Sequence, residues 1–159
     1  MIIHFGYDKK QVLQALRYHF ITRPEIKILL IVVNVFTIIS AVLLYMHKIQ
    51  PLSFLIFSVL WFLLIITVWK ILPASIYNKS ETFRDNFSMN INDSEIVLDT
   101  NRGAHAWQWN NFSSFVESPY FFHLYFNSRS FFLVPKDAFK GILELQEVRQ
   151  IFREKISKR

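Results

Sequence analysis

Two long stretches without a charged residue dominate the hydrophobic pattern of the chain. They run from Ile28 to Met46, which is 19 residues, and from Ile49 to Trp69, which is 21 residues. At a helical rise of about 1.5 Å per residue they extend roughly 28 and 31 Å, close to the roughly 30 Å hydrocarbon core of a bilayer. Neither stretch has the polar stripe that an amphipathic helix on a soluble core carries. The pattern therefore predicts two transmembrane helices.

The connection between these helices, from His47 to Pro51, is so short that the helices must be antiparallel neighbours. Both chain ends then lie on the same side of the membrane. Basic residues gather on the flanks of the hairpin, whereas the connection holds only Lys48 and a histidine, so the positive-inside rule predicts that both ends are cytoplasmic. The expected location is the cell (inner) membrane, crossed twice. The flanking basic residues are Lys9, Lys10, Arg17, Arg23, Lys27, Lys70, Lys79 and Arg84.

The residues before the hairpin predict a strand followed by an amphipathic helix, together spanning residues 1–24. Ile2–Phe5 has the pattern of a short strand, and Asp8 followed by Gln11 resembles a capping box at a helix start. Pro24 is expected to end this helix. An isolated strand is unstable, so we expect Ile2–Phe5 to join a sheet formed later in the chain. The apolar face of the helix consists of Val12, Leu13, Leu16 and Phe20.

After the hairpin, which we place at residues 25–72, the pattern changes to short alternating runs separated by turn residues. Residues 73–159 are therefore predicted to form a cytoplasmic antiparallel β domain closed by a C-terminal amphipathic helix. The apolar face of that helix contains Leu145, Val148, Phe152 and Ile156. The predicted strands are Thr82–Ile91, Glu95–Asp99, Gly103–Trp109, Phe112–Glu117, Tyr120–Phe126 and Ser130–Val134, with one turn at Thr100–Arg102. The predicted fold class is an α+β membrane protein.

The net charge of +6 and the pI near 9.7 raise the question of nucleic-acid binding. The charge lies mainly beside the apolar stretches: residues 1–27 carry +3, residues 28–70 carry +2, and residues 71–159 carry only +1. A nucleic-acid-binding domain concentrates its basic residues on the folded domain. The charge distribution thus favours membrane orientation and argues against nucleic acid as a partner.

The residue types needed for catalysis or metal binding are sparse and scattered. The chain has no cysteine, and none of its five histidines is spaced from another histidine or a carboxylate as metal ligands are. Three glycines are too few for a phosphate-binding loop, and the serines lack a nucleophile elbow. We therefore expect no catalytic residues, no cofactor and no metal, and predict that the protein is not an enzyme.

Asn34 lies near the middle of the first apolar stretch, where a polar side chain either marks a functional pathway or bonds to a neighbouring helix. The absence of any charge in both stretches argues against a transporter or channel built from one chain. We therefore expect Asn34 to hydrogen-bond to the second helix or to a second copy of the chain.

Four motifs occur in an order that resembles the YcxB-like family of bacterial membrane proteins. They are Trp107–Trp109, Phe112–Glu117, Tyr120–Tyr125 and the Phe132–Phe139 run, which contains Pro135 and Lys136. The N-terminal strand and helix before a two-span hairpin look similar as well. The resemblance implies a small pleckstrin-homology-like module, in which a curved antiparallel sheet is closed by a C-terminal helix. It implies no activity, because function resides in particular sites and not in a fold.

Large aromatic side chains occupy both faces of the predicted strand Tyr120–Phe126. One face must belong to the core, and the other must be covered by a helix, the membrane surface or a partner. Trp107 and Trp109 lie two residues apart, so we expect them to share one face and at least one of them to pack in the core. The alternative is a ligand site, for which we expect the tryptophans to be exposed and their removal to leave the fold stable. The full set of candidate interaction residues is Trp107, Trp109, Tyr120, Phe122, Tyr125, Arg149, Arg153 and Lys158.

These features predict a membrane-anchored, non-enzymatic interaction or regulatory protein whose cytoplasmic domain binds an unidentified protein. An immunity-type protein that neutralises a toxin at the membrane is one specific version. The alternative is peripheral sensing of anionic lipids, in which the basic N-terminal helix and the basic C-terminal tail meet lipid headgroups. The basic residues of the tail are Arg149, Arg153, Lys155, Lys158 and Arg159. An enzyme acting on membrane lipids is the third hypothesis. Membrane lipids are partners in each case. The pattern leaves open whether the chain forms a homo-oligomer.

Overall fold

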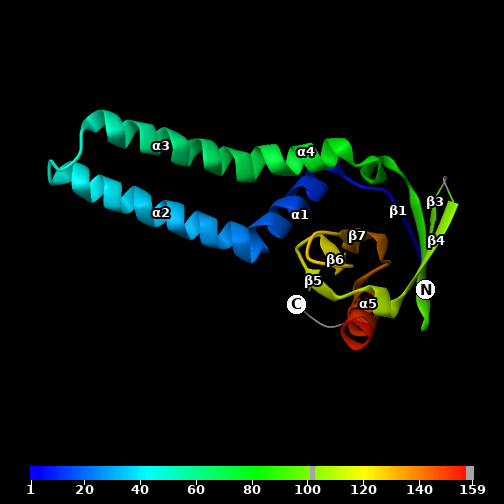
Figure 1. The fold of residues 1–159 in the computed structure, drawn as a ribbon. Helices are drawn as coiled ribbons and strands as arrows, with labels where there is room; N and C mark the ends of the chain where they lie inside the picture. The colour runs from blue at the N-terminus through cyan, green and yellow to red at the C-terminus, as the bar shows by residue number, and fades with distance from the viewer. Residues whose placement is uncertain (101–102, 157–159) are drawn as a thin grey trace. The chain divides into compact units, whose positions relative to one another are not determined.

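The structure of the protein, a computed structural model, describes residues 1–100 and 103–156 (Figure 1). The chain forms two compact units: Met1–Ala15 with Glu81–Arg159, and Leu16–Ser80. The first is called here the β unit and the second the hairpin unit. These units divide the chain differently from the three expected segments. The N-terminal strand groups with the β unit, whereas the hairpin unit continues to Ser80.

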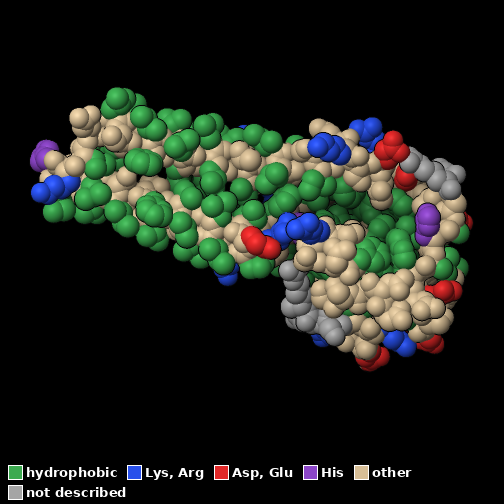
Figure 2. Space-filling view, viewed as in Figure 1, with side chains coloured by type: hydrophobic (Ala, Val, Ile, Leu, Met, Phe, Trp, Pro, Cys, Tyr) green, Lys and Arg blue, Asp and Glu red, His purple; other side chains and the backbone are tan. Residues whose placement is uncertain are grey.

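The hairpin unit contains two long apolar helices joined by a short connection. The first is α2, Pro24–Tyr45, and the second runs without a break from Pro51 to Lys79. The most apolar 18-residue windows of the two helices have mean hydropathies of 2.7 and 2.5, and both helices are long and apolar enough to cross a membrane. Hydrophobic side chains cover the helices of the hairpin (Figure 2). The second helix consists of α3 (Pro51–Ile66), the π-helical turn η1 (Thr67–Ile71) and α4 (Leu72–Lys79).

The second helix continues past Pro73, where we expected the helical pattern to end. A proline inside a helix has no N–H for the carbonyl four residues earlier, here that of Trp69. The π turn lies just before Pro73, and the Leu72 N–H donates to the Thr67 carbonyl. Arg17 Nε donates to the Trp69 carbonyl at 2.9 Å, and the guanidinium lies 5.7 Å from the Trp69 ring centroid. The widened turn and the arginine together accommodate the proline.

Asn34 binds across the hairpin, which confirms one of the two expected arrangements. Its side-chain N–H donates to the Leu30 carbonyl at 2.7 Å, and its Oδ1 accepts from Trp61 Nε1 at 3.4 Å. Asn34 lies on α2 and Trp61 on α3. The polar atoms of both side chains are thus paired, although Asn34 lies on the exposed surface of the helix pair.

The N-terminal residues form the strand and helix that the pattern predicts. Strand β1, Ile2–Phe5, pairs antiparallel with a strand near residue 90, so the prediction that it joins the later sheet is confirmed. Helix α1, Lys9–Thr22, begins after Asp8, whose Oδ1 accepts the Gln11 N–H at 3.0 Å. This is the N-terminal cap that the sequence predicts. The helix ends just before Pro24.

Seven strands of the β unit form two antiparallel sheets within the described residues. Sheet A has the order β1-β2-β3-β4, and sheet B has the order β5-β6-β7. The expected strand from Thr82 begins only at Phe87, because Glu81–Arg84 forms a 3₁₀ turn. The expected turn at Thr100–Arg102 includes residues 101–102, which lie outside the described residues. The strands after β1 are β2 (Phe87–Ile91), β3 (Glu95–Thr100), β4 (Gly103–Gln108), β5 (Ser114–Glu117), β6 (Phe121–Tyr125) and β7 (Phe131–Pro135).

Helix α5, Ile142–Lys155, follows the sheets and buries the apolar face that its periodicity predicts. Val148 and Phe152 are fully buried, and Ile156 just beyond the helix is 2% exposed. Phe152 contacts Trp109, Phe115 and Phe122 ring to ring. The helix thus joins one core with residues from both sheets.

Both faces of β6 are buried within the chain. Phe122 and Leu124 belong to the main core cluster, while Phe121, His123 and Tyr125 on the opposite face are at most 1% exposed. Tyr7, two positions after β1, covers part of that second face. The Tyr7 ring contacts Phe121, its hydroxyl donates to the Leu133 carbonyl at 2.6 Å, and burial raises its pKa well above the usual value.

Candidate functional site

Three charged side chains from separate elements of the β unit meet at the end of β5. Glu117 closes β5, Lys136 follows β7, and Arg149 lies in α5. Arg149 Nε and Nη2 donate to the two carboxylate oxygens of Glu117 at 2.9 and 2.8 Å. Lys136 Nζ lies 2.7 Å from Oε1 of the same carboxylate. We call Glu117, Lys136 and Arg149 the ion-pair cluster.

The backbone around the cluster explains why these residues meet. The Ser118 N–H donates to the Phe121 carbonyl at 2.9 Å, which makes a tight turn directly after Glu117. The Lys136 N–H then donates to the Tyr120 carbonyl at 2.9 Å, so the end of β7 is held beside that turn. The Lys136 ammonium also lies 5.4 Å from the centroid of the Phe122 ring. The β5–β6 turn and the end of β7 therefore place one carboxylate beside two cations.

The cluster keeps Glu117 ionised. The hydrogen bonds from Arg149 are the main cause that lowers the pKa of Glu117 to about 2, with a further contribution from Lys136, and partial burial opposes the shift. The same pairing raises the pKa of Arg149. A general acid or base at neutral pH needs a pKa near 7. Glu117 is therefore better placed to hold α5 against the sheet than to transfer protons.

A pocket of about 570 Å³ lies beside the cluster along one side of α5, lined by Glu117, Gln146, Arg149, Gln150 and Arg153. The four helical residues recur at the spacing of one helix face. Glu117 cancels one of the two arginine charges, so the lining keeps one positive charge, and Lys136 adds another beside it. Gln146 adds an amide donor, whereas the Gln150 amide donates to the Glu154 carboxylate at 2.8 Å. Such a lining fits a single anionic group, such as a phosphate or a carboxylate.

The ion-pair cluster lies within a segment of the chain that matches a known protein family. A family model described as YcxB-like protein matches residues 91–152. This segment, 62 of the chain's 159 residues and called here the YcxB-like segment, is similar to that family. The resemblance expected from the motif order is thereby confirmed over β3 to β7 and most of α5. Comparison with curated proteins and with solved structures finds no match.

Two of the motif residues that carried the resemblance, Glu117 and Lys136, take part in the ion-pair cluster of the YcxB-like segment. The cluster was not predicted from the sequence. Glu117 and Arg149 are separated by 32 positions, and no spacing rule links them. The motif itself was the only signal, because it singled out a glutamate before a turn and a lysine after a proline.

The candidate interaction residues that the structure describes fall into three groups. Trp109 and Phe122 are 7% and 0% exposed and belong to the core cluster, and Tyr125 is 1% exposed, so none of the three offers an accessible surface. Tyr120 is 44% exposed and Trp107 is partly buried. Arg149 and Arg153 meet at the pocket beside α5. Lys158 lies outside the described residues.

The two tryptophans differ from the expected arrangement in one respect. Trp107 lies on β4, whereas Trp109 lies in the 3₁₀ turn Trp109–Asn111, so strand alternation does not relate the two side chains. Both rings nevertheless contact Phe112. Trp109 belongs to the core cluster, which confirms that at least one tryptophan packs there.

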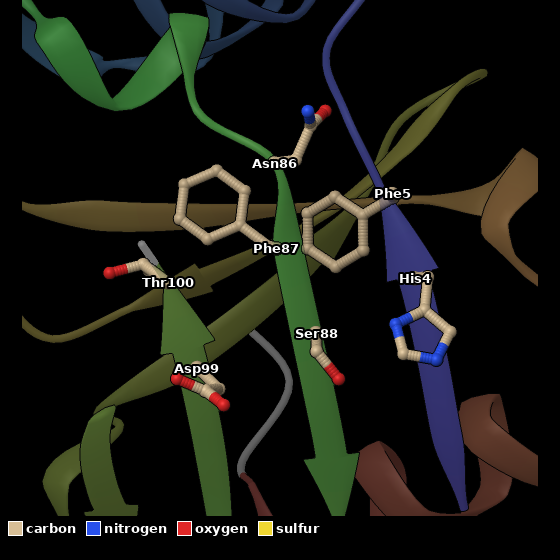
Figure 3. Close-up of a pocket in the computed structure, with 7 residues that line it drawn as sticks. All are labelled: His4, Phe5, Asn86, Phe87, Ser88, Asp99 and Thr100. Atoms are coloured by element: carbon tan, nitrogen blue, oxygen red, sulfur yellow. The ribbon is translucent and has the colours of Figure 1, made fainter. Parts of the chain in front are cut away.

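A second pocket, of about 510 Å³, lies on sheet A (Figure 3). The strand register aligns His4 with Ser88 and Ser88 with Asp99, and alternate positions share one face of a sheet. Ser88 therefore stands between His4 and Asp99, which are about 10 Å apart at the usual strand spacing. A catalytic triad needs the histidine between the serine and the acidic residue, so His4, Ser88 and Asp99 do not have the order of a triad. Among the described residues, no group of three or more histidines, aspartates or glutamates is placed to hold a metal ion.

Proposed function

We propose that this chain is a membrane-anchored interaction or regulatory protein that acts without catalysis. The observation that carries the proposal is the surface of the hairpin unit. Only 6% of the most apolar window of either long helix is buried inside the structure, whereas the core helix of a soluble protein is mostly buried. Exposing that much apolar surface to water is unfavourable, and a bilayer removes the cost. The hairpin then serves as an anchor for the β unit.

A reporter fused after Arg159 and a thiol label at Gln50→Cys should report opposite sides of the membrane. The chain has no cysteine, so the introduced thiol is the single labelled position. A membrane-impermeant reagent should label Gln50→Cys in intact cells. Ser128→Cys, an exposed position in the β6–β7 turn, is the matched control and should be labelled only after permeabilisation. Equal labelling of both positions in intact cells would rule out the proposed topology.

The architecture of the β unit supports a pleckstrin-homology-like module as the part that recognises a partner. The β unit contains a four-stranded and a three-stranded antiparallel sheet, and its C-terminal helix packs into the core that the two sheets share. The immunity-type version of the proposal adds that the partner is a toxin acting at the membrane. A gene for a large toxin next to the gene for this chain would favour that version.

Sensing of anionic lipids is a second candidate, favoured by the positively charged pocket along α5. Arg153 is the residue with which to test it, because Arg153→Gln removes a charge from the pocket and leaves the Arg149–Glu117 pair in place.

The test uses the full chain in nanodiscs with an environment-sensitive dye on Gln146→Cys, at the pocket. If the pocket senses anionic lipids, the dye emission should shift when phosphatidylglycerol replaces phosphatidylcholine. Arg153→Gln or high salt should reduce that shift. Arg129→Gln, which removes an exposed arginine from the β6–β7 turn, is the control and should leave the shift unchanged. The same dye response in all variants and in both lipids would exclude lipid sensing through this pocket.

A further inference from the structure

Strand β4 forms one edge of sheet A and is accessible along its length. Within the described part of the chain it pairs with β3 only. Five of its six residues are exposed, and Trp107, which points toward the core, is partly buried. The outer row of backbone N–H and C=O groups on such a strand is available to another extended chain.

The sequence of β4 has none of the usual features that prevent pairing at a sheet edge. Soluble proteins protect edges with lysines, prolines or bulges. The strand reads Gly-Ala-His-Ala-Trp-Gln, without a charged residue or a proline, and its register with β3 is continuous from Gly103 to Gln108. The edge therefore accepts a further strand without steric or electrostatic obstruction from its own side chains.

The register shows which backbone groups point outward. Thr100 and Gly103 face each other across a connection of two residues, and the pair that flanks such a hairpin connection is a hydrogen-bonded pair. Bonded and non-bonded pairs alternate along an antiparallel ladder. The backbone groups of Ala104, Ala106 and Gln108 therefore point away from β3, toward the open edge.

The outer face of the same strand pair is acidic. Asp99 lies opposite Ala104, and Glu95 lies opposite Gln108. The methyl group of Ala104 is too short to cover the Asp99 carboxylate. The long side chain of a lysine or arginine on an added strand can extend over the alanine and reach that carboxylate, and one on the same face further along can reach Glu95.

We propose that the edge of β4 binds an extended segment of another protein that carries lysine or arginine at alternate positions. Backbone hydrogen bonds to Ala104, Ala106 and Gln108 supply affinity, and Asp99 and Glu95 select for basic side chains. This proposal rests on the proposed interaction function and names the chemistry of the partner. A second copy of the chain fits less well, because its own β4 offers two alanines and a glutamine to the acidic residues and no cation.

The binding test uses the full-length protein in detergent micelles and a short fluorescent peptide of alternating lysine and valine. We expect saturable binding, measured by fluorescence anisotropy. A peptide with glutamate in place of lysine, and a lysine peptide with methylated backbone nitrogens, should both bind at least about tenfold more weakly. The double variant Glu95→Gln with Asp99→Asn should weaken binding of the lysine peptide by about tenfold, as expected for the loss of two exposed ion pairs.

Amide hydrogen exchange provides a readout that separates strand addition from simple charge attraction. Bound peptide should slow the exchange of the Ala104, Ala106 and Gln108 amides and leave the His105 amide, already directed at β3, nearly unchanged. Ala106→Pro should abolish binding while keeping the melting temperature, because an edge strand tolerates proline where its N–H faces outward. If that variant unfolds, the exchange pattern and the double variant still decide the outcome.

Three results would overturn the proposal. They are equal binding of the lysine and glutamate peptides, binding without protection at Ala104 and Ala106, and self-association of the protein through β4. The proposed interaction function can hold even if this docking site is wrong, and a cross-linking experiment distinguishes the two. A protein partner that cross-links equally to the wild type and to Ala106→Pro in native membranes would preserve that function and exclude this docking site.

Discussion

Replacing Trp109 with alanine is expected to lower the free energy of unfolding of the β unit by about 3 to 5 kcal/mol. The indole is 7% exposed, contacts the rings of Phe112 and Phe152, and donates from Nε1 to the Asn92 carbonyl at 3.1 Å. Its removal leaves a cavity where α5 meets the sheets and leaves that carbonyl without its donor. For a chain of this size the melting temperature should fall by roughly 10 °C, measured in detergent solution.

Two further variants separate packing from hydrogen bonding. Trp109→Phe keeps most of the buried ring and should cost about 1 kcal/mol for the lost hydrogen bond, plus a smaller packing loss. Trp107→Ala removes a partly buried ring and should cost less than Trp109→Ala. If Trp109→Ala melts at the wild-type temperature, the core position of this residue is wrong, and both tryptophans become candidates for a binding surface.

Replacing Glu117 with glutamine is expected to destabilise the β unit by about 1 to 3 kcal/mol at neutral pH. The Glu117 side chain is 27% exposed, which is between the exposures typical of surface and of buried ion pairs. The expected loss of stability is therefore also between the values for those two kinds of pair. The variant leaves Arg149 and Lys136 without their shared anion at the contact between α5 and the sheets. Denaturant titration of the full chain in detergent at neutral pH measures the difference.

The stability of the wild type should also depend on pH through this residue. Folding lowers the pKa of Glu117 from 4.5 to about 2, so the stabilisation is complete above pH 4.5 and is lost as the pH falls toward 2. The full shift corresponds to about 3 kcal/mol, and partial exposure reduces the expected effect to about 1 to 2 kcal/mol. Glu117→Gln should show a flatter stability curve over this range. Glu147→Gln, at an exposed position of α5, is the matched control and should follow the wild type.

The local patterns that the sequence carries were sufficient for most of the secondary structure. The uncharged stretches predicted both long helices, and Asp8 and Pro24 marked the limits of α1. Turn residues separated the strands correctly, although the strand ends shifted by several residues where 3₁₀ turns intervene, as at Glu81–Arg84 and Trp109–Asn111. Such patterns work because periodicity, capping and turn preference depend on residues close together in the chain.

Other features depend on residues that only the fold brings together. Pro73 should end a helix by local rules, yet the π turn and Arg17, more than fifty positions away, accommodate it. Aromatic alternation placed large side chains on both faces of β6, but only packing decided that Phe122 and Tyr125 are buried within the chain.

The sequence by itself thus determined the class of the protein, an apolar helical hairpin joined to an antiparallel β domain, because hydrophobic periodicity is a local property. Only the tertiary structure decided that Glu117 is held by Arg149 and Lys136 and that β4 is an open edge beside two carboxylates. Both features arise from strand order and helix docking, which bring together residues distant in the chain. Charges and open backbone groups acquire their roles only from such neighbours.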